Sequence, residues 1–259
     1  MARPLPPSEV MAPVGPVFRR RPRVPDLAAV VTAVWATEIP HGVRTLRVVP
    51  DAALDLVLVG GRLVASGPDT RAIRESATAG WVLGFQLAPG AVAHVLGAPA
   101  SVCVDGRTEV TELWGAPGRQ LCDQLADTTD RRAAAALVER AIAARLPDLE
   151  VDPVPAALRR TFGGGGPVDH RRLGLGERQL RRRCIAAFGY PTATLRRIVR
   201  FRRFMDAIAS DRTSDLAILA HELGYSDQSH LTHEVREFSG LTPHAIRAIA
   251  SAAPNTAVA

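Results

Sequence analysis

The last third of the chain contains one short pattern twice, and this repetition constrains the fold more than any other feature. Residues 173–175 (Leu-Gly-Leu) precede an amphipathic stretch at 177–188, and residues 223–225 (Leu-Gly-Tyr) precede another at 227–238. In the second copy the glycine can adopt the left-handed conformation that ends one helix before the next begins. The pattern therefore predicts two helix-turn-helix units.

The second unit shows its first helix most clearly. Ala217, Ala220 and Leu223 recur every three residues, so they share one face of a short helix. Asp215 is placed to cap the start of this helix, and Gly224 is placed to end it.

The second helix of this unit has an apolar face and a polar face. Leu231, Val235 and Phe238 recur at spacings of four and three, and Ser226 or Asp227 can cap their helix. The opposite face carries the side chains Ser229, Thr232, His233 and Arg236. Reading base edges in a major groove requires donors and acceptors of this kind, although an ordinary solvated face has the same polarity.

The first unit repeats this arrangement with more positive charge. Leu180, Cys184 and Ala187 form its inner face. Its outer face carries Arg178, Arg181 and Arg182. A guanidinium can bind guanine with two hydrogen bonds or bind a phosphate, so the cluster suits DNA and leaves the partner of each arginine open.

A single helix over residues 191–209 is predicted between the two units. Its apolar stripe consists of Leu195, Ile198, Phe201, Met205 and Ile208. Its second stripe consists of Arg196, Arg200 and Arg203, which are candidates for phosphate contacts. At about 1.5 Å per residue such a helix is about 27 Å long, close to the roughly 34 Å that separates successive major grooves.

The net charge lies entirely in this C-terminal part. Residues 151–259 contain 16 arginines and 10 acidic residues, whereas residues 1–150 contain 16 of each. Such a field attracts polyanions. All 32 basic residues are arginine, which also fits a compositional bias of the source.

These residues resemble the AraC/XylS type of transcriptional regulator over roughly residues 155–250. The resemblance is carried by residues 173–190, 197–204 and 219–247. It implies a DNA-binding domain of two helix-turn-helix units joined by a long helix. It also implies that bases or nearby phosphates are approached by Arg178, Arg181, Arg182, Gln228, Ser229, Thr232 and His233.

Two features depart from that family. Gly163–Gly166 and Pro167 occupy the start of the first unit, leaving 168–173 as its helix, and glycine disfavours helix by about 1 kcal/mol per residue. His233 stands where the family usually has arginine, so the second half-site is expected to be read with less charge.

The N-terminal half is predicted to be β-rich. Short β-branched or alternating runs occupy residues 43–49, 54–59, 62–65 and 81–87, with glycine and proline between them. Helices are expected over residues 91–96, 118–125 and 130–146.

This half is similar to a sensor-like N-terminal domain found in a subset of the same regulators. The similarity is carried by Trp35, by residues 50–56 (Pro-Asp and Asp-Leu) and by residues 84–90 (Gly-Phe, Leu and Pro-Gly). It implies a small barrel-like domain for an effector or for dimerisation. Candidates for a pocket are Trp35, Asp51, Asp55, Trp81 and Phe85; alternatively, the aromatic rings belong to the core and the aspartates form turns.

The sequence gives little evidence of an active site, a metal site or a membrane-spanning segment. The lone His41 and His94 lack metal-ligand spacing, and no nucleophile elbow or phosphate loop occurs, so we expect no enzyme, cofactor or metal. Cys103, Cys122 and Cys184 are too few for the four-cysteine metal site of repair proteins that share this DNA-binding domain. No apolar stretch is typical of a bilayer span or a secretion signal, so a cytoplasmic protein is expected.

The predicted architecture is α+β in two domains. It has an extended Pro/Arg-rich arm (1–25), a β-rich, barrel-like domain with helices (26–150), an all-α double helix-turn-helix domain (151–252) and a tail (253–259). The predicted function is sequence-specific regulation of transcription, with double-stranded DNA as partner and a small effector, RNA polymerase and a second copy as further candidates. The alternatives are a DNA-binding protein with a structural or dimerising first domain, and a β-barrel enzyme fused to a DNA-binding domain.

Overall fold

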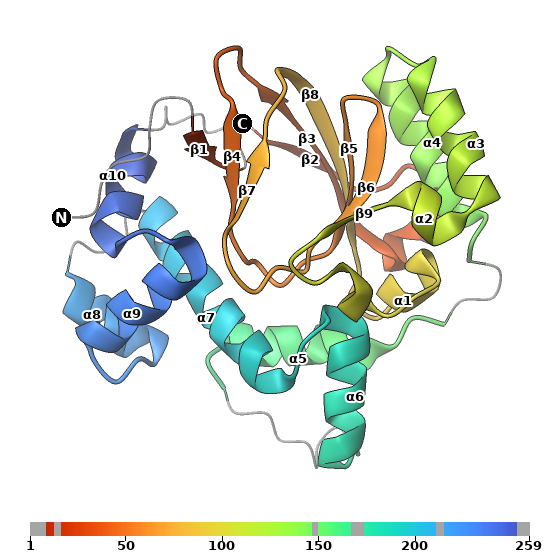
Figure 1. Ribbon diagram of the computed structural model, residues 1–259. Helices are drawn as coiled ribbons and strands as arrows, with labels where there is room; N and C mark the ends of the chain where they lie inside the picture. The colour runs from red at the N-terminus through yellow and green to blue at the C-terminus, as the bar shows by residue number, and fades with distance from the viewer. Residues whose placement is uncertain (1–8, 13–16, 147–149, 167–173, 211–214, 253–259) are drawn as a thin grey trace.

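The computed structural model describes residues 9–12, 17–146, 150–166, 174–210 and 215–252. It shows a β-rich N-terminal part with helices and an all-helical C-terminal part, as predicted (Figure 1). None of the described helices is long and apolar enough to cross a membrane.

The N-terminal part contains two sheets that face each other (Figure 1). The smaller sheet has the order β1-β4-β7, with β1 at Glu9–Met11, β4 at Thr45–Val48 and β7 at Ile73–Ser76. The larger sheet has the order β2-β3-β8-β5-β6-β9. Its strands are β2 (Phe18–Arg20), β3 (Val31–Ile39), β8 (Gly80–Leu87), β5 (Asp55–Val59), β6 (Arg62–Ser66) and β9 (Arg107–Glu109).

The two sheets of the barrel-like part are not closed into a barrel. Each sheet has open edges, and no strand-to-strand pairing joins the two sheets within the described residues. The edge strand β9 is three residues long and runs directly into helix α2 at Val110, so the larger sheet ends there. The four strands predicted after the arm correspond to β4, β5, β6 and β8. Strands β1 and β2 lie within the arm itself, residues 1–25.

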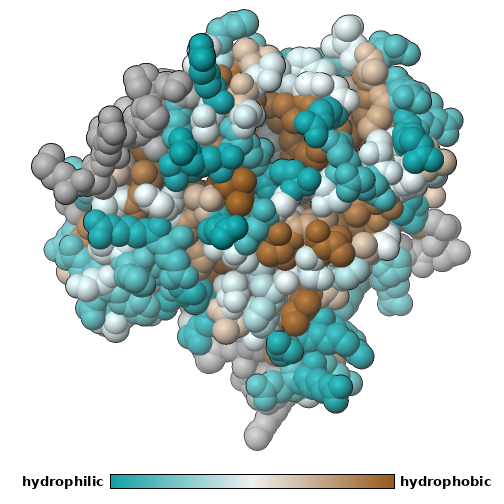
Figure 2. All heavy atoms as spheres, in the orientation of Figure 1, coloured by the Kyte–Doolittle hydropathy of each residue, from teal (hydrophilic) through white to brown (hydrophobic). Residues whose placement is uncertain are grey.

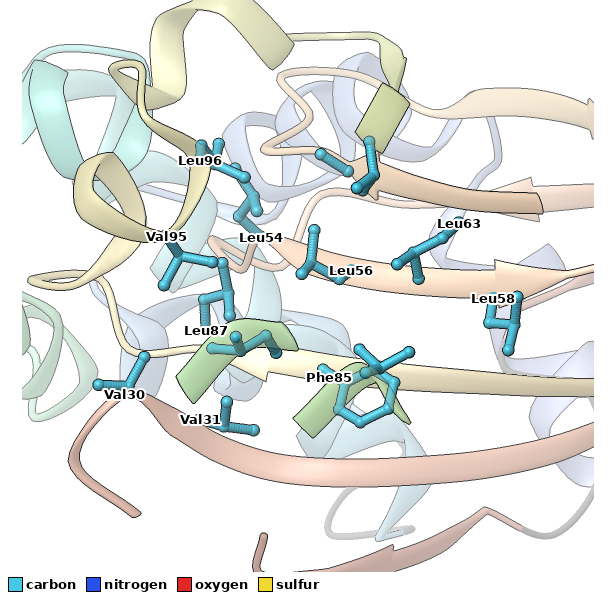
Figure 3. Packing of buried hydrophobic residues seen from close by; sticks show 14 of the residues in the cluster. Val30, Val31, Leu54, Leu56, Leu58, Leu63, Phe85, Leu87, Val95 and Leu96 are labelled. Carbon is cyan, nitrogen blue, oxygen red and sulfur yellow. The ribbon is translucent and has the colours of Figure 1, made fainter. Parts of the chain in front are cut away.

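Helices cover one face of the larger sheet. They are α1 (Val92–Leu96), α2 (Val110–Trp114), α3 (Ala116–Ala126) and α4 (Arg131–Ala143), with short 3-10 turns at Pro25–Ala29 (η1) and Ala100–Cys103 (η2). Their apolar side chains meet those of β5, β6 and β8 in one buried core, where Leu56, Phe85 and Leu96 are fully enclosed (Figure 3). Apolar burial of this kind is the main stabilising term in folding.

The C-terminal part is built around α7 (Thr192–Ala209), which packs against the other helices of this part. These are α5 (Pro153–Gly163), α6 (Glu177–Phe188), α8 (Leu216–Leu223), α9 (Gln228–Ser239) and α10 (Pro243–Ala252). The predicted apolar stripe of α7 is confirmed, since Leu195, Ile198, Phe201 and Ile208 are buried in the second core and Met205 packs against it. Helix α6 ends just before the start of α7, and α9 packs alongside α7 at Arg197 and Arg200.

The two parts touch at both helix-turn-helix units. At the first unit, α6 packs against η2, and a Cβ on Gly189 would lie 2.3 Å from the Val104 side chain. At the second unit, the Arg47 guanidinium donates to the Ser239 carbonyl oxygen at 3.0 Å. The N-terminal part therefore contacts the ends of both α6 and α9.

Candidate nucleic-acid interface and interdomain pocket

The second helix-turn-helix unit is held in shape by its caps. The Asp215 carboxylate accepts from the Ala217 amide at 2.7 Å, and Gly224 ends α8 with φ of 78°. Asp227 then begins α9 by accepting from the His230 amide at 2.8 Å. Capping satisfies amides that have no partner inside a helix, so both helices begin where the sequence predicts.

The predicted reading face of α9 points to solvent. Leu231, Val235 and Phe238 are buried on the opposite side. Of the candidate DNA contacts, the exposed ones are Gln228, Ser229, His233 and Arg236, while Thr232 is half-buried. The side chains that would reach DNA therefore share one surface.

His230 is an exposed residue of α9 that the sequence analysis did not select. Its Nδ1 lies 3.1 Å from Ser226 Oγ, and its ring meets the Tyr225 ring edge-on with centroids 5.2 Å apart. It lies in the first turn of α9, where helix N-termini favour anions. Its position directly after Ser229, a predicted DNA contact, could have identified it from the sequence.

The first unit presents α6 in the same way. Arg178, Arg181 and Arg182 are exposed, and Leu180 and Cys184 lie on the buried side. The helix predicted over 168–173 lies outside the described residues, but the preceding glycines do end a helix, since α5 stops at Gly163.

The arginines of α7 have different environments. Arg196 is exposed, whereas Arg203 is half-buried with Nη2 3.5 Å from the Glu222 carbonyl oxygen. Arg200 donates to both oxygens of the buried Glu234, at 3.0 Å and 2.6 Å, and its guanidinium lies 4.1 Å above the Tyr225 ring. Arg200 thus fastens α9 to α7, and its phosphate contact stays a prediction, as do those of Arg196 and Arg203.

A second arginine completes the cluster around Glu234. Arg197 Nε donates to Glu234 Oε2 at 2.9 Å, and its Nη2 donates to Glu237 at 2.5 Å. Burial raises the pKa of Glu234, but the bonds from Arg200 and Arg197 more than offset this, so the pKa is lowered. The carboxylate is therefore charged at neutral pH, which holds the orientation of the reading helix.

A cavity of about 210 Å³ lies between the two sheets and the connector α7. Figure 2 shows apolar side chains between the sheets with hydrophilic ones around them. The cavity lining includes three of the predicted pocket residues, Trp35, Asp51 and Asp55, together with Arg202 from α7.

The other two predicted pocket residues lie elsewhere, because side chains alternate along a strand. On β8, Val82 and Gln86 line the cavity, whereas Phe85 points to the helices and is fully buried in the core. Trp81 lies four residues before Phe85 and therefore on the same face of β8, where it packs against that core.

Trp35 and Asp55 form the inner wall of the cavity. The Trp35 indole Nε1 donates to Asp55 Oδ1 at 3.0 Å. A Cβ on Gly84 would lie 2.0 Å from Trp35 Cε2, so the indole lies against a position that only glycine permits. Burial, with a smaller contribution from Asp51, raises the pKa of Asp55 to about 7, although the Trp35 bond partly opposes this.

Arg107 and Arg202, near the cavity, are paired with carboxylates. Arg107 binds both oxygens of Asp69, at 2.9 Å and 3.1 Å, and also binds Glu75. Arg202 is 3.9 Å from Asp51 and 3.0 Å from Asp206. Arg202 thus links the cavity to α7, the helix that joins the two helix-turn-helix units.

Metal ligands and disulfides are not found in the described part of the chain. It contains no group of three or more His, Cys, Asp or Glu side chains arranged to hold a metal ion. The thiols of Cys103, Cys122 and Cys184 are free, and burial raises the pKa of each.

Comparison with known protein families assigns both parts of the chain. Residues 170–249 match the family described as a helix-turn-helix domain, which is of the AraC type. Residues 19–109 match a family described as a domain of unknown function (DUF6597). No curated protein matches the chain.

Two solved structures of ToxT from Vibrio cholerae align with most of the chain at low similarity. Apo ToxT from strain SCE256, a single-substitution variant, is 8% identical with a TM-score of 0.41, covering 89% of this chain and 99% of that one. A second ToxT structure is 7% identical with a TM-score of 0.34, covering 90% of this chain and 97% of that one.

Proposed function

We propose that this chain, which carries an AraC-type helix-turn-helix domain, regulates transcription by inserting α6 and α9 into successive major grooves of double-stranded DNA. In this proposal the N-terminal part binds a small effector and transmits its presence to the DNA-binding part. A second copy of the chain and RNA polymerase are partners that such a regulator would use.

The observation that carries the proposal is the pair of exposed polar faces on α6 and α9, the two helices that α7 joins. The connector has 18 residues, or about 27 Å at about 1.5 Å per residue. That length is of the order of the roughly 34 Å between successive major grooves. The reading helices therefore suit a site whose halves lie about one helical turn apart.

The charge of the DNA-binding part supports the same conclusion. Between Arg159 and Arg203 there are 13 arginines and two acidic residues. Arg178, Arg181 and Arg182 are exposed on α6, where they can contact bases or phosphates. Such a surface accelerates encounters with DNA and makes the affinity depend on salt.

The cavity between the sheets favours an effector over a purely structural N-terminal part. A core residue would be enclosed by apolar neighbours, whereas Asp55 faces a cavity of about 210 Å³. Arg202 of α7 lines the same cavity, so a ligand there would contact the connector directly. This gives effector binding a route to both reading helices.

Selection of duplexes from a randomised pool by the full chain tests the proposal. We expect two enriched blocks about 10 base pairs apart, as for two helices in successive grooves. The Arg181→Ala variant should lose preference within one block, and the Thr232→Ala variant within the other. The control Arg131→Ala, on the exposed surface of α4, should select the same site as the native chain. A pool without enrichment would reject the proposal.

A further inference from the structure

The cavity between the sheets combines apolar walls with one carboxylate that lacks a cationic partner. Its lining includes Ile39, Val57 and Val82, with the Trp35 indole on the same side as Asp55. Among the described residues, no arginine or histidine forms an ion pair with Asp55, and no donor reaches its Oδ2. A carboxylate in such a site either takes up a proton or needs a cationic partner, which a ligand can supply.

Three carboxylates and three arginines surround Asp55, so the cavity has four carboxylates and three arginines when Asp55 is counted. The surrounding groups come from β2, the β4–β5 segment, the segment after β6, and β7, β9 and α7, and they are Arg19, Asp51, Asp69, Glu75, Arg107 and Arg202. Arg107 serves both Asp69 and Glu75, and Arg202 serves Asp206 as well as Asp51. Arg107 and Arg202 are thus paired with other carboxylates, and Arg19 acts on Asp55 through its charge without an ion pair among the described residues.

We propose that this cavity binds a small organic cation, a primary amine on an apolar body, with its ammonium group at Asp55 and its body against Trp35 and the valine side chains. The inference rests on the proposed effector role of the N-terminal part. The cavity, at about 210 Å³, is smaller than the roughly 300–1,000 Å³ of sites for drug-sized ligands, so the ligand is correspondingly small.

The chemistry of the wall explains why a cation fits better than its neutral or anionic analogue. An ammonium group can donate to Oδ2 of Asp55 and lie near the Trp35 ring, whose face attracts cations. An alcohol would leave the carboxylate charge uncompensated. An acid would place two carboxyl groups together, which raises the cost of ionising either.

Protonation of Asp55 makes the binding depend on pH in a defined direction. Its pKa is about 7, so the carboxylate loses its charge as pH falls below neutrality. An ammonium ion binds the charged form, so its affinity should rise with pH through about 7 while the amine itself stays protonated. An anionic ligand would show the opposite trend.

Isothermal titration of the full chain with two matched series of probes tests this inference. The series are 2-phenylethylamine, 2-phenylethanol and phenylacetate, and hexylamine, 1-hexanol and hexanoate. We expect at least one amine to bind about tenfold or more tightly than its alcohol and its acid, with affinity rising between about pH 6 and 8. The same experiment on the native chain requires no variant that could fail to fold.

Two variants locate the site. Asp55→Asn should weaken the amine about tenfold or more, leave the alcohol unchanged and remove the rise with pH. Trp35→Phe, which keeps an apolar ring, should weaken the amine more than the alcohol. Asp123→Asn, at an exposed acid on α3, should bind like the native chain.

Three results would overturn the inference. These are an acid or alcohol that binds as tightly as its amine, an affinity that Asp55→Asn leaves unchanged, and no binding by either amine at about 10 mM. DNA selection by the unliganded chain is measured separately. Loss of the amine preference with DNA selection intact would reject the cation alone, whereas amine binding without DNA selection would reject the proposed function.

Discussion

Arg182 offers the sharpest test of base reading by a single side chain. It is exposed on α6 beside Arg178 and Arg181. If it binds a base edge, Arg182→Ala should cost about 1–3 kcal/mol on the selected duplex and much less on shuffled DNA. Fluorescence anisotropy with both duplexes measures this difference. An equal loss on both would show that Arg182 contacts phosphate instead.

Glu234 shows how one buried carboxylate positions a reading helix. Glu234→Gln removes the charge that Arg197 and Arg200 share, so we expect the free energy of unfolding to fall by at least about 2 kcal/mol in urea titration. The matched variant Glu237→Gln removes a carboxylate that is 45% exposed, which should cost less than about 1 kcal/mol. Equal losses from the two variants would contradict this role.

The lowered pKa of Glu234 also sets the direction of a pH effect. Because the folded-state pKa is below the ordinary 4.5, the ion pair contributes its full stability above about 4.5 and loses it as pH falls through the folded value. The native chain should therefore lose stability on acidification within this window, and Glu234→Gln should lose less. Urea titrations at a series of acidic pH values measure both. A native curve parallel to that of Glu234→Gln would exclude a contribution from this group.

At the scale of elements, Gly84 connects strand β8 to the geometry of the cavity. Gly84→Ala places a Cβ 2.0 Å from Trp35 Cε2, so the indole must move and its bond to Asp55 must lengthen or break. We expect a loss of about 1–3 kcal/mol in stability and a changed tryptophan emission spectrum. Gly106→Ala is the control, because its nearest neighbouring atom would be 3.5 Å away. If Gly84→Ala behaves like this control, the indole does not lie where the structure places it.

Periodicity predicted helices α6 to α9 because their apolar residues recur without interruption, whereas α5 and α10 were not predicted. Asp215, Gly224 and the stripe of α7 all have the predicted structural roles. Strands β3 and β7 were not predicted, since alanine interrupts the first and the second has four residues of which only Ile73 is apolar. Short segments of this kind become strands through pairing with partners distant in sequence, which local patterns do not contain.

Alternation along the strands separates the pocket candidates that line the cavity from those that lie at the core. Trp35 and Asp55 occupy the cavity face of β3 and β5, whereas Trp81 and Phe85 occupy the core face of β8. The sequence shows which residues of a strand share a face. Which of the two faces lines a cavity depends on the helices that cover the other face.

At the scale of the whole molecule, the DNA-binding part is joined to the N-terminal part by contacts that no local pattern contains. The Arg47 contact to Ser239 spans 192 residues, and Arg202 approaches Asp51 from α7. These contacts place the cavity against α7, which joins the two helix-turn-helix units. The structure therefore gives the proposed effector a physical route to DNA binding.

The most direct test of sequence-specific DNA reading is fluorescence anisotropy of the full chain on DNA from immediately upstream of its own coding region, against scrambled DNA, at two salt concentrations. Phosphate contacts weaken as salt rises, whereas discrimination between sequences depends on base contacts and DNA shape. We predict a preference for the upstream DNA that persists at the higher salt. Equal binding to both duplexes that disappears at the higher salt would mean that the basic surface alone binds DNA, which would contradict the account.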